Sequence, residues 1–265
     1  MTAIEAAILH GSALETPNCT SSSRSGLLIR FGDPVPYSIA WALQQQFHAE
    51  RLSGSRTDTL ILLEHLPVYT AGRRTKTVHL KPRDASSDHP MVPIEKVSRG
   101  GSITYHGPGQ LIGYPILVLS RYASGAKRYV QLLEEVLIRT LLYWEIQAYR
   151  VVKAPGVWTR DKQGEAKIAS IGARIDRGIT LHGFALNVCN DLLPFSRIVP
   201  CGLDGCRMTS MEQTKQASIS VPLVAEHLAR EFSTVFQLKW STVAPDSTVQ
   251  TDFEAQPVVA SRRES

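Results

Sequence analysis

Hydrophobic side chains recur at helical spacing in three segments of the chain. Apolar residues fall three or four positions apart in each segment, which places them on one face of a helix. The first segment follows Pro36, a residue that favours helix entry. The pattern predicts three amphipathic helices, Tyr37–Leu52, Ala126–Glu145 and Val221–Phe236. Their apolar stripes are typical of core packing and not of a binding site.

Five short runs rich in β-branched residues are bounded by Gly, Pro or Asp, and these runs predict strands. They are Thr59–Glu64, Leu111–Leu119, Gly156–Arg160, Lys167–Ile175 and Ile179–Val188. The polar run 161–165 predicts a hairpin turn that places Lys167 early in the fourth of these strands. Helices and strands in this irregular order predict an α/β domain of the α+β type, with a mixed β-sheet flanked by helices rather than a doubly wound parallel sheet.

A single folded unit accounts for the patterned part of the chain. The periodic segments run from about residue 27 to 243, whereas the last residues are polar and the first are rich in Ser and Thr. We therefore expect a flexible N-terminal segment 1–26, a catalytic domain 27–243 and a disordered tail 244–265. The stretch 84–96 carries no chemical signal.

Composition narrows the class of protein. Of the 265 residues, 43% are hydrophobic and 20% charged, as in ordinary soluble domains, and no uncharged apolar run is long enough to predict a membrane span. The net charge is +5, but Lys and Arg are spread along the chain without the basic stripe of a nucleic-acid binder. The positive charge either steers an acidic protein partner towards the chain or only keeps the chain soluble.

The cysteines do not indicate a disulfide framework or a metal site. Cys19, Cys189, Cys201 and Cys206 lack CxxC spacing, and no secretory signal precedes them. We expect Cys189 and Cys206 to be small buried apolar residues. The N-terminus is poor in Arg and contains two glutamates, which matches a mitochondrial presequence badly.

The densest chemical signal is the Gly-rich stretch 99–110, RGGSITYHGPGQ. Glycines let the backbone approach a ligand closely, although the same residues also suit a tight turn between strands. The stretch lacks the GK[ST] ending of a phosphate loop and the GxGxxG of a dinucleotide loop, so we predict no phosphate cofactor.

Two further segments contain groups that can carry chemistry. Lys167 precedes a nearly apolar strand, where its amine is either partly desolvated or at a strand end in water. Cys201 ends the apolar run IVPCG at a turn that could hold its thiol at the mouth of a pocket. A neighbouring cation favours the reactive thiolate, but a lone cysteine is more often core. His182 could line a pocket or be a core residue.

Five blocks occur in the order RGGSITYHGPGQ, GVWT, KIASIGARI, LHGFALN and IVPCG. Together they resemble the lipoyl(octanoyl) transferases, also called lipoate-protein ligase B type octanoyltransferases, over residues from about 59 to 210. The resemblance implies a fold similar to the biotin/lipoate protein ligase catalytic domain, and a catalytic dyad of Cys201 and Lys167. The substrate-binding residues that it implies are Arg99, Gly100, Gly101, Ser102, Ile103, Thr104, Tyr105, His106, Ser170, Ile171, Gly172, Gly183, Phe184 and Ala185.

The resemblance also implies a reaction. An octanoyl group would pass from octanoyl-acyl carrier protein to a Cys201 thioester, and then to a lysine of lipoyl domains in 2-oxoacid dehydrogenase E2 subunits or glycine cleavage H protein. No cofactor, metal or ATP is expected, and no nucleic acid or membrane partner. By resemblance, Arg73 and Arg74 are candidates for contacting an acidic partner, unless they are merely solvated. The implied location is mitochondrial for a eukaryotic member and cytoplasmic otherwise.

Three other classes of function remain open from the residues. An ATP-dependent lipoate or biotin ligase would share the sheet but would activate its acid as an adenylate and would not require Cys201. A thiol hydrolase would need His106 or His182 as a base beside Cys201. A carrier-binding module would have the pocket without the catalysis.

Overall fold

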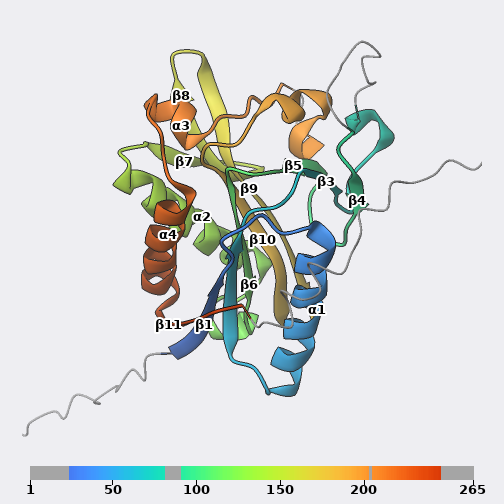
Figure 1. Cartoon of the computed structure of the whole chain (residues 1–265), viewed down its shortest axis with the longest axis vertical. Helices are drawn as coiled ribbons and strands as arrows, with labels where there is room; N and C mark the ends of the chain where they lie inside the picture. Colours follow the sequence, from blue (N-terminus) through green and yellow to red (C-terminus); the bar gives the residue numbers. More distant parts are fainter. Residues whose placement is uncertain (1–23, 81–90, 203–204, 246–265) are drawn as a thin grey trace, which may run out of the picture.

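A mixed eight-stranded sheet forms the centre of the computed structural model, which describes residues 24–80, 91–202 and 205–245 (Figure 1). The strand order is β11-β1-β2-β6-β10-β9-β8-β7. The strands are β1 (Arg24–Arg30), β2 (Asp58–Leu63), β6 (Gln110–Ile116), β7 (Ala148–Val151), β8 (Ala154–Asp161), β9 (Gly164–Asp176), β10 (Ile179–Asn187) and β11 (Leu238–Val243). β1 pairs in parallel with β2 and β11, and the other neighbours are antiparallel. The predicted mixed sheet is confirmed.

Helices cover both faces of this sheet. α1 (Tyr37–Ser53) packs on β6 and β10 from one side, while α2 (Ala126–Tyr143) and α4 (Val221–Phe236) pack together on the other (Figure 1). One apolar core lies under α2 and α4, and a second lies under α1. The three predicted helices are confirmed. Within the described chain, no helix combines the length and apolarity that a membrane crossing requires.

A small second sheet was not predicted. It has the order β4-β3-β5 and consists of β3 (Val68–Ala71), β4 (Ile94–Lys96) and β5 (Ile103–His106). These strands are at the short end of the usual length, so their alternation is too brief to stand out in the sequence. β5 lies inside the Gly-rich stretch, and β4 lies inside the stretch 84–96. The short helix η4 (Pro200–Gly202) packs against β5 of the small sheet.

The predicted hairpin joins β8 to β9. Asp161 pairs with Gly164, so the turn consists of Lys162 and Gln163 and is tighter than expected. β9 therefore starts at Gly164, and Lys167 lies opposite Trp158 near its beginning.

The predictions for two cysteines were wrong. Cys189 is exposed and Cys206 is half-buried, so neither is a core residue. Cys189 follows the end of β10, and its N–H donates to the Gly109 carbonyl in a turn that has left the sheet. Cys19, most of the predicted N-terminal segment 1–26 and most of the predicted tail 244–265 lie outside the described residues, and β1 already begins at Arg24.

Candidate active site

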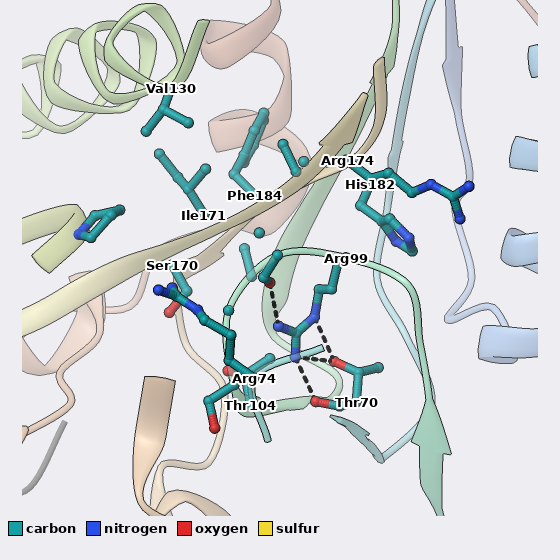
Figure 2. Close-up of a pocket in the computed structure, with 18 of the residues that line it drawn as sticks. Thr70, Arg74, Arg99, Thr104, Val130, Ser170, Ile171, Arg174, His182 and Phe184 are labelled. Carbon is teal, nitrogen blue, oxygen red and sulfur yellow. Dashed lines mark hydrogen bonds between the residues drawn. The ribbon is translucent and has the colours of Figure 1, made fainter. Parts of the chain in front are cut away.

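A cavity of about 670 Å³ lies where the main sheet meets the small sheet and η4 (Figure 2). Its walls come from β5, β9, β10, the start of α2 and the turn at Gly202. A cavity of this volume is large enough for a medium-sized organic ligand.

Lys167 lies in this cavity and is 1% exposed. Its backbone N–H donates to the Arg207 carbonyl over 2.8 Å, and its own carbonyl accepts from the Thr209 N–H over 3.0 Å. The side-chain Nζ lies 5.4 Å from the centre of the Trp158 ring. The sequence left open whether this amine is in water at a strand end, and the structure buries it. Lys167 is thereby tied to the segment that follows Cys201.

Gly156 provides the space for the Lys167 side chain. A Cβ atom at Gly156 would lie 2.6 Å from Cε of Lys167 and 2.4 Å from the carbonyl oxygen of Ala169. The backbone at Gly156 has a φ of +119°, in the region that favours glycine. The GVWT block therefore begins with the residue that makes room for the buried lysine.

Cys201 lies in η4, at the edge of the cavity. Gly202, the next residue, lines the cavity, and its N–H donates to the Val199 carbonyl over 3.0 Å. The Val199 N–H in turn donates to the carbonyl of His79 over 2.9 Å. These bonds hold the turn that carries Cys201 beside the cavity that contains Lys167.

The stretch 99–106 splits between the cavity and the core because β5 alternates. Ser102, Thr104 and His106 line the cavity, whereas Ile103 and Tyr105 pack into a third apolar cluster. The expectation that all of 99–106 lines the pocket is therefore corrected at Ile103 and Tyr105. These two side chains face the opposite side of the strand.

Arg99, Gly100 and Gly101 form one wall of the cavity. The Arg99 side chain is buried, and its Nε donates to Thr70 Oγ1 over 3.2 Å while its Nη1 donates to the Gly100 carbonyl over 3.0 Å (Figure 2). A Cβ atom at Gly172 would lie 2.9 Å from Cδ of Arg99. Gly172 thus allows the guanidinium stem to cross β9.

The two triplets 170–172 and 183–185 line the cavity directly opposite each other. In the antiparallel pairing of β9 and β10, Ser170 faces Ala185, Ile171 faces Phe184 and Gly172 faces Gly183. Ile171 and Phe184 point to the same side as Val130 of α2, while Arg99 and His182 lie on the other side of β9 (Figure 2). One end of the cavity is therefore apolar and the other polar.

His106 and His182 both line the cavity but are held in the neutral form. His106 bonds to Gln110 Oε1 over 2.8 Å and to Thr70 Oγ1 over 3.1 Å, and burial holds its pKa well below the usual range. His182 stacks on Trp41 with ring centres 4.9 Å apart. Burial, with help from the charge of Arg99, lowers the pKa of His182 to about 3.

Sequence reasoning missed several polar residues of the cavity. His79 lines it, and its Nδ1 lies 2.6 Å from Ser102 Oγ. Tyr37 and Tyr114 also line the cavity. In the sequence, Tyr37 indicates only the start of a helix, and Tyr114 only a residue of a buried strand. The Tyr114 hydroxyl lies 2.7 Å from Nε2 of the buried His65. Only the tertiary fold brings these residues together, because each sits in a different segment.

The charged side chains described in the cavity wall are all cationic. Neither Asp nor Glu occurs among its described lining residues, whereas seven cationic residues do: Arg73, Arg74, Lys76, Arg99, Lys153, Lys167 and Arg174. Arg73 and Arg74 are exposed at the rim, so they are solvated and also border the cavity. A negatively charged or electron-rich ligand is favoured by such a wall.

Comparisons with known proteins agree on one family. Residues 36–233 match the model of the lipoyl protein ligase A/B catalytic domain. The chain is 43% identical to an octanoyltransferase of Geobacter sulfurreducens over 75% of the chain and 80% of that protein.

Solved structures share the fold at low sequence identity. A lipoate-protein ligase A bound with ATP matches with a TM-score of 0.64 and 16% identity, over 88% of this chain and 95% of the other. The biotin protein ligase of Aquifex aeolicus in complex with biotin and ATP matches with a TM-score of 0.50 and 11% identity, over 80% of this chain and 70% of the other. The predicted likeness to biotin and lipoate ligase domains is confirmed for the fold.

Proposed function

Because the chain belongs to the lipoyl(octanoyl) transferase family and is an acyltransferase, we propose that it transfers octanoyl groups through a thioester on Cys201. The observation that carries this proposal is the burial of Lys167 in a cavity whose wall includes Gly202, the neighbour of Cys201. A buried cation beside a cysteine favours the thiolate, which is the attacking form of the residue.

In the first half-reaction, the Cys201 thiolate attacks the thioester carbonyl of octanoyl-acyl carrier protein. The tetrahedral oxyanion then collapses and expels the thiol of the carrier, so that the octanoyl group is bound to Cys201. Lys167 stabilises the thiolate before attack and supplies the proton that the departing thiol takes up. Backbone N–H groups near Cys201 or Gly172 bind the oxyanion, each worth roughly 3 kcal/mol.

In the second half-reaction, a lysine of a lipoyl domain attacks the octanoyl-enzyme and forms an amide. The exchange of a thioester for an amide is downhill, so the reaction needs no ATP. The acceptors are lipoyl domains of 2-oxoacid dehydrogenase E2 subunits and of glycine cleavage H protein.

The positive cavity rim supports this choice of partners. Acyl carrier proteins and lipoyl domains are acidic in general, and the exposed Arg73 and Arg74 would meet them at the mouth of the cavity. Rim charges of this kind chiefly raise the rate of encounter. The mitochondrial location stays a prediction, and the relative named above is bacterial.

The cavity chemistry favours transfer over the other classes of function. His106 and His182, the bases that a hydrolase would need, are neutral and already engaged by hydrogen bonding or stacking. An ATP-dependent ligase shares the fold, but its chemistry gives no role to the pairing of a buried lysine with a cysteine turn. Lys167 and Cys201 are instead the groups that thioester exchange requires.

The intact mass of the protein tests the proposal. After incubation with octanoyl-acyl carrier protein, we expect one added octanoyl group on Cys201, which a lipoyl domain then removes without ATP. An adenylated acid would indicate a ligase, and free octanoate without amide would indicate a hydrolase. The exposed Cys189 provides the control, since Cys189→Ser should acquire the same mass.

Two variants sharpen this experiment. A Cys201→Ser protein that transfers octanoate as well as the wild type would disprove the covalent mechanism. Lys167→Ala should slow acylation and move its pH profile to higher pH, because the thiolate loses its cation. An unchanged profile would remove Lys167 from its assigned role.

A further inference from the structure

Glu134 is a buried carboxylate that the mechanism described above does not use. It lies on α2 and is 6% exposed. Acidic side chains are rarely buried to this degree unless they are paired, and Glu134 has two partners. Its Oε1 accepts from the Gly156 N–H over 3.1 Å, and its Oε2 lies 3.2 Å from Nε of Arg150. The carboxylate therefore joins α2 to β8 and to β7.

The Gly156 N–H bonds to a side chain because the ladder between β8 and β9 does not reach it. The pairing begins at Val157, which lies opposite Ala169, and the register shifts between Val157 and Trp158. Gly156 precedes this pairing and has a φ of +119°, which few other residues adopt. A hydrogen bond to a carboxylate is roughly twice as strong as one between neutral groups. Glu134 thus holds Gly156 in an unusual backbone conformation.

The same glycine borders the amine of Lys167. A Cβ atom at Gly156 would lie 2.6 Å from Cε of Lys167 and 3.2 Å from its Nζ. The backbone of Lys167 is held from elsewhere, by its bonds to Arg207 and Thr209. Gly156 therefore limits where the end of the lysine side chain can lie.

We propose that Glu134 is a positioning residue for acyl transfer, which sets the place of the Lys167 amine through Gly156. This inference rests on the proposed function, in which Lys167 stabilises the Cys201 thiolate. When the bond from Glu134 is lost, Gly156 is released and the amine loses one wall of its site. The amine then spends less time near the sulfur, so the thiolate fraction falls and acylation of Cys201 slows.

Glu134 acts through the backbone of Gly156 and not through its own charge or through bound substrate. The guanidinium of Arg150 offsets the charge of the carboxylate. Arg150 is itself held on α2, because its Nη2 donates to Glu135 Oε2 over 2.7 Å and to the Gln131 carbonyl over 3.2 Å. Glu134 is not among the described residues that line the cavity.

Acylation of the full-length protein by octanoyl-acyl carrier protein tests this role. Intact mass gives the rate at several donor concentrations for the wild type, Glu134→Ala, Glu134→Asp and Glu134→Gln. Aspartate keeps the charge but is one methylene too short to reach Gly156, whereas glutamine keeps an oxygen that can accept from its N–H. Glu135→Ala is the matched control, because Glu135 shares the partner Arg150 but has no bond to Gly156.

We expect Glu134→Ala and Glu134→Asp to lower the maximal acylation rate roughly tenfold or more, as a misplaced catalytic group does. The donor concentration at half-maximal rate should stay within about twofold of the wild type, because Glu134 does not touch the donor. Glu134→Gln should be clearly faster than Glu134→Ala. Glu135→Ala should keep the wild-type rate. If Glu134→Ala does not fold, Glu134→Asp carries the test.

A background without the lysine separates positioning from a general structural role. Lys167→Ala and the double variant Glu134→Ala/Lys167→Ala should be acylated at the same rate, within about twofold, because an effect transmitted through Lys167 disappears with it. Alkylation of Cys201 by iodoacetamide, located by peptide mass, should follow the same pattern in the absence of any donor.

The outcomes separate this inference from the proposed function. If the wild type acquires no octanoyl group on Cys201, the proposed function fails and the role of Glu134 with it. If the wild type is acylated but Glu134→Ala and Glu134→Asp are no slower than Glu135→Ala, only the positioning role is overturned. A Glu134→Gln protein as slow as Glu134→Ala, or an equal loss with and without Lys167, would also overturn it.

Discussion

Lys167 reaches its buried position because Gly156 has no side chain. A Cβ there would overlap Cε of Lys167 at 2.6 Å and the Ala169 carbonyl at 2.4 Å. Neither neighbour can yield without cost, since the carbonyl belongs to the β9 backbone and the lysine stem is fully enclosed. The buried position of Lys167 thus depends on a residue that carries no chemistry of its own.

Gly156→Ala should therefore impair acylation of Cys201 beyond its effect on stability. We expect a loss of about 1–3 kcal/mol in the free energy of unfolding from the strained φ and the overlap, and a fall in acylation rate similar to that of Lys167→Ala. Urea unfolding and the rate of mass gain measure the two effects.

Gly164→Ala is the matched control for this prediction. Gly164 has a φ of +107°, but a Cβ there would meet no atom within 4 Å. Gly164→Ala therefore introduces the backbone strain without displacing Lys167. If both variants lose the same fraction of acylation rate, Gly156 does not position the lysine.

At the scale of the element, β5 shows how one strand serves both the core and the cavity. Ile103 is fully buried among apolar side chains, while Thr104, the next residue, lines the cavity. We expect Ile103→Ala to lower the free energy of unfolding by about 2–5 kcal/mol through the void that it leaves. Thr104→Ala should cost much less stability and lower the rate of octanoyl transfer more. Urea unfolding measures the stability of the two variants, and octanoyl transfer to a lipoyl domain measures their activity. If Thr104→Ala lost more stability and Ile103→Ala more activity, this assignment of the two faces of β5 would be contradicted.

The sequence predicted the elements in which a hydrophobic pattern repeats over many residues. It missed the strands that are short and those that pair with a strand far away in the sequence. α1, α2 and α4 carry full helical stripes, and β9 and β10 are long strands. β1 and β11 lie at the two ends of the described chain and come together through a parallel pairing. Local patterns hold no information on such a contact.

The candidate site divides in the same way. Motif blocks identified Lys167 and the opposed triplets of β9 and β10, because each is a local string of unusual residues. His79 was missed because its partner, Ser102, lies in another segment and nothing in the sequence around His79 is distinctive. The faces of β5 were missed because the Gly-rich stretch reads as a loop and not as a strand.

At the scale of the whole molecule, the polar end of the cavity makes the fold sensitive to acid. Three histidines are buried there or next to it, and none has a carboxylate among its hydrogen-bond partners in the described part of the chain. Burial lowers the pKa of His65 to about 4 and the pKa of His182 to about 3, and it holds the pKa of His106 well below its usual range. In the unfolded chain all three titrate near pH 6.5.

The sign of the pH effect follows from these directions. Below about pH 6.5 these histidines are protonated in the unfolded chain but stay neutral in the folded chain. The free energy of unfolding that they contribute above that pH is therefore lost as the pH falls towards about 4. Each histidine contributes about 1.4 kcal/mol per pH unit, and three together about 4 kcal/mol per unit. Against a total of about 5–15 kcal/mol for a domain, this slope predicts unfolding in mild acid.

Urea unfolding at several pH values between neutrality and mild acid measures this slope. Replacing His65 by Gln should reduce the slope by about a third, because only two of the three histidines then bind a proton on unfolding. Equal free energies of unfolding at neutral pH and in mild acid would mean that the buried histidines are protonated in the folded state. The neutral imidazoles that line the polar end of the cavity would then have to be reassigned as cations.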